Sequence, residues 1–179
     1  MRKKVRNKIE PLDQYDFPWN EDEFIFLHKE EYSGSIGEFL ISFSNLESAL
    51  NLMVVNLING RGHELGYKVI KSLSYSNKIH LAKDLYLLNI ELISNQKTKE
   101  KKREEFKLIL EKLNDLGESR NRIAHANWVT LDKYGYVRTK ISSDESGLVH
   151  FIKIKITPKL MQKWARVSDR LASQLFQIP

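Results

Sequence analysis

The longest helical pattern in the chain ends in the stretch Glu118-Ser119-Arg120-Asn121-Arg122-Ile123-Ala124-His125. Two arginines, an asparagine and a histidine stand close together in this stretch, beside apolar positions. Upstream of it, large apolar side chains recur at helical spacing, from Phe106 through Leu110 to Leu113. We therefore expect one helix over residues 99–125, with a polar cluster at its end.

The rest of the chain predicts a mainly α-helical bundle around this helix. Amphipathic patterns predict helices over residues 35–59, 62–74 and 77–95, and Thr157-Pro158 is typical of the start of a final helix. Ser74–Asn77 fits a connector or cap. The expected fold is an up-and-down bundle of four to five helices. Several leucines and valines are expected to point inward in the two shorter helices; they include Leu65, Val69, Leu88 and Leu92.

The spacing of apolar side chains changes from a helical to an alternating pattern before the last helix, which indicates an insertion. Residues 127–156 alternate polar and apolar side chains, and Gly135 fits the turn of a hairpin. A small antiparallel β insertion of two or three strands is therefore expected at about 127–156. Residues 1–32 form an N-terminal arm, irregular apart from a short helix near residues 20–31. Residues 33–179 form the bundle, with no linker that splits it.

Two charged residues lie where core side chains are expected. At about 100° per residue, Glu47 falls about 20° from the line through Ile36 and Val54. On the long helix, Arg120 lies about 40° from Phe106 by the same measure. An isolated buried charge is costly, and a guanidinium matches a carboxylate as a bidentate pair. We therefore expect Glu47 to meet Arg120 across a helix–helix interface.

Composition excludes several classes of protein. The 179 residues contain no cysteine, so disulfides and thiolate metal sites are ruled out, and the reducing cytoplasm is the expected compartment. The sequence holds no uninterrupted apolar run of about 18 residues and no secretory signal, so no membrane association is expected. A net charge of +6 favours polyanionic partners. The basic residues of 96–105 fit a solvated loop and first helical turn, with a nucleic-acid patch as the alternative.

The polar cluster contains the groups that RNA cleavage requires. A histidine can move the proton of the attacking 2′-hydroxyl, and an arginine can stabilise charge on the phosphate oxygens. Asn121 precedes His125 by one helical turn and can orient the imidazole or hold a phosphate oxygen. The other histidines show no ligand spacing, so we expect no metal site and no cofactor.

Arginine, a polar residue and histidine at the end of a bundle helix resemble the motif of the HEPN family (higher eukaryotes and prokaryotes nucleotide-binding domain). The resemblance covers residues 33–126 and the last helix. It implies a metal-independent endoribonuclease that leaves a 2′,3′-cyclic phosphate, with Arg120, Asn121 and His125 as catalytic residues. Glu47 and Arg122 would support them. Many members act as dimers in toxin–antitoxin or phage-defence systems, so RNA, a second copy and an antitoxin protein are the implied partners.

Other interpretations of the same residues stay open. Arg120 can be a structural partner of Glu47, Asn121 a local cap, Arg122 a surface residue, and His125 an ordinary helix-end histidine. Trp128 fits the core, with base stacking as the alternative. The chain can then be a catalytically inactive HEPN-like module that binds RNA, a nucleotide or a protein, or a bundle with a structural role alone.

Overall fold

The computed structural model describes residues 22–58, 63–131, 135–143, 147 and 149–178. Its helices are α1 (Asp22–Ile58), α2 (His63–Ile70), α3 (Tyr75–Glu91), α4 (Gln96–Ala124) and α5 (Pro158–Phe176). Its strands are β1 (Asn127–Leu131), β2 (Gly135–Ser143) and β3 (Val149–Lys155). The predicted fold class is therefore confirmed: a mainly helical bundle carries a small antiparallel sheet before its last helix.

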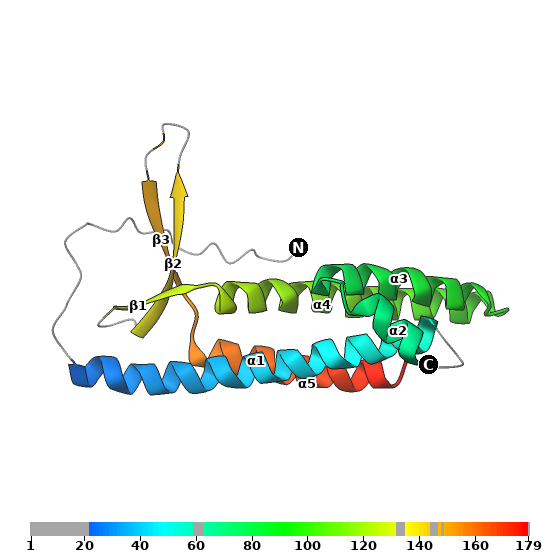
Figure 1. The fold of residues 1–179 in the computed structure, drawn as a ribbon, viewed down its shortest axis with the longest axis horizontal. Coiled ribbons are helices and arrows are strands. Elements are labelled where there is room, and N and C mark those ends of the chain that lie inside the picture. The colour runs from blue at the N-terminus through cyan, green and yellow to red at the C-terminus, as the bar shows by residue number, and fades with distance from the viewer. Residues whose placement is uncertain (1–21, 59–62, 132–134, 144–146, 148, 179) are drawn as a thin grey trace.

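The helices form two layers along the long axis of the molecule (Figure 1). One layer contains α1 and α5, which run in the same direction, and the other contains α3 and α4, which run in opposite directions. The short α2 lies at the end of the bundle where α1 stops, and the sheet lies at the opposite end, where α4 stops and α5 begins. The end of α4 that carries the polar cluster is therefore next to the sheet.

Helix α1 is the central element of the bundle, and it packs against α5, α3, α2 and α4. Its fully buried side chains include Leu46, Leu50 and Val54, and also Phe39, while Ile36 is only partly buried. The helix expected near residues 20–31 is present, but it is not a separate short helix: it is an N-terminal extension of the helix expected over 35–59, because α1 runs from Asp22 to Ile58. Residues 1–21 of the predicted arm lie outside the described residues. The extension gives α1 the length to reach the sheet, where Tyr32 is buried.

The apolar character of α1 has a structural explanation. The segment Lys29–Ile58 is long and apolar enough to cross a bilayer, with a mean hydropathy of 1.3 in its most apolar window. That window is 44% buried inside the protein. A central core helix needs apolar side chains on more than one face, because several neighbours pack around it. Such a composition is accordingly weak evidence for a membrane span.

Side-chain caps lie at the starts of three helices, two of which, α3 and α5, have the caps that the sequence predicts. The Ser74 hydroxyl accepts a hydrogen bond from the Asn77 backbone N–H at the start of α3. Asn95 and Thr157 cap α4 and α5 in the same way, and Pro158 occupies the first turn of α5. A side-chain oxygen at this position satisfies one of the backbone N–H groups that have no partner within the helix.

The rotation of the shorter helices differs from the prediction. Four residues expected to point inward are exposed, and they are Leu65, Val69, Leu88 and Leu92. The buried face of α3 is formed by Ile79, which was predicted to point inward, together with Ala82, Tyr86 and Ile90. Helices with apolar side chains around much of their circumference do not reveal from sequence which side faces a neighbour.

The sheet has the order β1-β2-β3, and both pairs are antiparallel. Gly135 pairs with Leu131 at the start of β2, and the predicted turn itself lies outside the described residues. Two aromatic side chains, Trp128 of β1 and Tyr136 of β2, pack against Tyr32 of α1, with ring centroids 6.3 and 5.6 Å away. This packing confirms a core role for Trp128 and joins the sheet to the bundle.

The basic residues after residue 95 belong to the first turns of α4. Glu91, at the end of α3, forms ion pairs with Lys99 and Arg103 of α4. Hydrogen bonds from both cations hold the pKa of Glu91 below its ordinary value. These two cations therefore close the α3–α4 connection, so they are not free for a nucleic acid.

Candidate functional site

Arg120 lies at the boundary between α4 and the central helix. Its guanidinium carbon is 5.8 Å from the centroid of the buried Phe43 ring of α1, a cation–π distance. Its Nη1 donates a hydrogen bond of 3.1 Å to Oδ1 of Asn121. No carboxylate lies within 4.0 Å of this guanidinium among residues that the structure describes. Arg120 is thus held in place by neutral groups and keeps its charge available.

The expected pair between Glu47 and Arg120 was wrong. Oε1 of Glu47 instead accepts a hydrogen bond of 2.8 Å from Nζ of Lys78, in the first turns of α3. The Lys78 side chain is only 11% exposed and that of Glu47 30% exposed, so the pair is partly shielded from bulk water. The prediction that Glu47 needs a basic partner is confirmed, but its partner comes from another helix.

A cavity of about 650 Å³ opens beneath Arg120. It lies between α1, the start of α3 and the last third of α4, and Arg120 and Glu47 both line it. The structure therefore brings together three residues that the sequence singled out, namely Glu47, Arg120 and Asn121. Its lining also includes Phe43, Tyr75 and Ser76.

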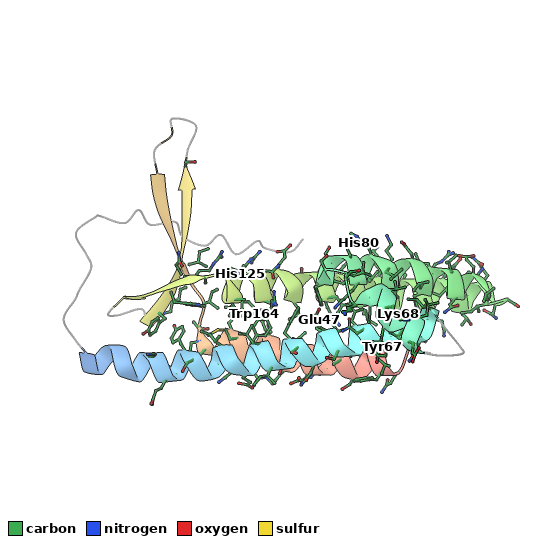
Figure 2. All side chains as sticks on the ribbon, viewed as in Figure 1. Glu47, Tyr67, Lys68, His80, His125 and Trp164 are labelled. Carbon is green, nitrogen blue, oxygen red and sulfur yellow. The ribbon has the colours of Figure 1, made fainter. Side chains whose placement is uncertain are left out.

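His125 stands apart from this cavity. It caps the C-terminus of α4, and its backbone N–H donates to the Asn121 carbonyl oxygen at 3.2 Å. Its side chain is exposed, next to the start of the sheet (Figure 2). Asn121 is therefore the structural link between the two parts of the motif, because its side chain holds Arg120 and its backbone belongs to the turn that carries His125.

Arg122 points away from this group of residues. Its Nη2 forms an exposed ion pair of 2.7 Å with Oε2 of Glu118, one turn earlier on α4. Exposed pairs of this kind contribute little to stability. Arg122 therefore lies on the surface, as its surface interpretation predicted, and it is not part of the cavity lining.

Tyr75 forms part of the wall of the cavity. Its ring centroid is 4.8 Å from that of Phe43, and its hydroxyl donates a hydrogen bond of 3.2 Å to the Leu113 carbonyl oxygen. Burial, and to a smaller degree the nearby Glu47 carboxylate, raise the pKa of Tyr75 well above its usual range. The tyrosine is therefore neutral and fixed, and it stabilises the shape of the cavity.

Gly117 allows this close contact between α3 and α4. A Cβ atom at this position would lie 2.7 Å from Cε1 of Tyr75, closer than real Cβ atoms approach. We expect Gly117→Ala to lower the free energy of unfolding by roughly 1–3 kcal/mol, because Tyr75 must move and loses its hydrogen bond to Leu113. Urea unfolding of the two proteins measures this difference.

Gly37 of α1 provides the matched control, since a Cβ atom added there would have nothing within 4 Å. Alanine generally stabilises a helix interior by about 0.5–1 kcal/mol relative to glycine, so Gly37→Ala should raise the stability. A gain in stability from both substitutions would show that Tyr75 does not pack against Gly117 as described.

Two contributors to the site had no clear signal in the sequence. Lys78 occupies a position in a polar helix turn, and nothing in its spacing indicates Glu47 as its partner. Tyr75 follows a capping serine and has the pattern of an ordinary first-turn residue. Across the described residues, no group of three or more His, Asp or Glu side chains is arranged to hold a metal ion.

Comparisons with models of protein families, with curated proteins and with solved structures gave no match. The resemblance to the HEPN family accordingly rests on the residues of the motif and on their place at the end of a bundle helix.

Proposed function

We propose that this protein is a metal-independent endoribonuclease of the HEPN type that acts in the cytoplasm. The observation that carries the proposal is the Arg120 guanidinium, which has no carboxylate partner among the described residues and which Asn121 holds one helical turn before the exposed His125. A cation without a carboxylate partner is suited to a phosphate, and an exposed imidazole is suited to proton transfer.

In the proposed reaction, His125 removes the proton of a ribose 2′-hydroxyl. The 2′-oxygen then forms a bond to the adjacent phosphorus, and the bond from phosphorus to the 5′-oxygen breaks. The 5′-oxygen takes up a proton, so the products are a 2′,3′-cyclic phosphate and a free 5′-hydroxyl. Arg120 stabilises the negative charge that builds on the phosphate oxygens, as a preorganised cation does in other phosphate chemistry.

A second copy of the chain belongs to this proposal. One imidazole cannot act as base at the 2′-oxygen and as acid at the 5′-oxygen in the same step. A homodimer in which two His125 side chains face one groove supplies both groups. A role as a toxin with an antitoxin protein, or as a phage-defence effector, fits an enzyme of this kind.

The direct test is cleavage of a mixed-sequence RNA by pure protein in the presence of EDTA. We expect cleavage and a 2′,3′-cyclic phosphate on the products, detected by mass spectrometry. Arg120→Ala, purified in parallel, should cut about 10²–10³-fold more slowly, because one charge-stabilising group is lost. Equal rates for the two proteins would trace the activity to a contaminant and contradict the proposal.

One observation favours a second candidate, a catalytically inactive module that binds RNA or a nucleotide. The cavity beneath Arg120 is large enough for a ligand, and His125 does not line it. An inactive module would bind RNA, with an affinity that falls as salt rises, and would leave it intact.

A further inference from the structure

The cavity beneath Arg120 has the size of a small-molecule site. Its volume of about 650 Å³ falls within the roughly 300–1,000 Å³ typical of such pockets. It is a half-open pocket bordered by three separate helices, and the neutral, hydrogen-bonded Tyr75 fixes part of its wall. Double-helical RNA cannot enter a space of this volume, but a single nucleoside unit can.

The charged residues around the cavity favour an anionic ligand over a cationic one. Both carboxylates in the lining already have basic partners: Glu47 is paired with Lys78 at 2.8 Å, and Glu118 with Arg122 at 2.7 Å. Arg120 is the lining cation, and it has no carboxylate partner in the described part of the chain. Arg120 is therefore the lining group to which an anionic part of a ligand would bind.

The interior combines an aromatic wall with polar groups that can bind the edge of a base. Tyr75 offers a ring on which a base can stack, as aromatic side chains do for single-stranded nucleic acids. The exposed side chains of Ser76 and Asn114 line the same space, and both hydroxyl and amide groups can donate and accept hydrogen bonds. This mixture fits a nucleobase better than it fits a wholly apolar ligand.

From these three features we infer that the cavity is a base-binding subsite of the ribonuclease. It takes the base of the nucleotide whose phosphate lies against Arg120, and it makes cleavage selective for that base. The inference rests on the proposed function for its link to cleavage, although nucleotide binding can be measured without it.

The test measures binding of the four ribonucleoside 3′-monophosphates and of inorganic phosphate by calorimetry. Stacking and base contacts should make at least one nucleotide bind roughly 5- to 150-fold more tightly than phosphate. Ser76→Trp places a large side chain at an exposed position of the lining and should remove this gain. Asn114→Trp blocks the cavity from the opposite helix and should have the same effect.

His80→Trp is the matched control, because His80 is an exposed residue of α3 one turn after Ser76, and it lies outside the cavity lining. Figure 2 shows it on the outer face of α3. The His80→Trp variant should bind each nucleotide with a Kd within about twofold of that of the unmodified protein. A substitution at a remote surface position is expected to change the binding free energy by well below 1 kcal/mol. Thermal unfolding of all three variants identifies any that fail to fold.

The possible results separate this inference from the proposed function. Nucleotides that bind no better than phosphate, or that bind equally well to folded Ser76→Trp and Asn114→Trp, would overturn the inference. The unmodified protein and both variants could all cleave RNA without base preference. That result would support the proposed ribonuclease function and contradict the base-binding subsite. Loss of nucleotide binding in both variants, with no RNA cleavage by the unmodified protein, would support the subsite and reject the ribonuclease.

Discussion

We expect His125→Ala to slow RNA cleavage by about 10²–10⁴-fold, because a general acid–base group contributes a factor of this size. The free energy of unfolding should change by less than about 0.5 kcal/mol, since the side chain is exposed at the end of α4. A rate measurement on a short fluorescent RNA and a urea titration of the same preparations test both statements.

The control for this substitution is His80→Ala, which removes a second exposed histidine from α3. His80 has no role in the proposed chemistry, so its loss should leave the rate unchanged. A His125→Ala protein that is folded and cuts as fast as the unmodified protein would exclude this imidazole as the proton-transfer group. Equal losses in both histidine variants would show that the effect is not specific to His125.

The largest expected effect on stability belongs to Lys78→Met. Methionine keeps most of the volume of the lysine side chain, but it leaves the Glu47 carboxylate in the interface without its cation. Stranding a buried charge costs about 3–5 kcal/mol, and the 30% exposure of Glu47 reduces this to roughly 2–3 kcal/mol. Urea unfolding should show a lower midpoint with a similar slope.

Two further variants test whether the loss of the Glu47–Lys78 ion pair causes the lower stability. The double variant Glu47→Leu/Lys78→Met should recover most of the loss, because an apolar pair of similar volume can replace a buried ion pair. Lys101→Met removes one partner of the exposed pair with Glu105 and should change the stability by less than about 1 kcal/mol. If Lys78→Met is no more destabilising than Lys101→Met, the interface pair does not stabilise the fold.

The pairing of Glu47 also changes what is expected of Arg120. Had Glu47 and Arg120 formed the buried pair, Arg120→Ala would have been strongly destabilising. In the structure its partners are a neutral amide and an aromatic ring, so the substitution leaves no carboxylate stranded among the described residues. Loss of activity in a stable Arg120→Ala protein is therefore interpretable as loss of a functional charge.

The sequence alone determined the helical class of the fold, the position of the sheet and the capped starts of α3 and α5. These features depend on local physics, since a helix period, a capping hydroxyl and a strand alternation each involve residues near one another in the chain. The motif at the end of α4 was likewise visible, because Asn121 and His125 are separated by one helical turn.

Only the tertiary structure decided how these elements meet. Glu47 needs a basic partner wherever it lies, but the choice of Lys78 over Arg120 depends on how α3 and α4 are rotated against α1. The same rotation exposes Leu88 and Leu92, and it places Arg120 over the cavity but His125 outside it. Helix rotation is set by the summed packing of side chains from distant parts of the chain, and no single stretch of sequence contains that sum.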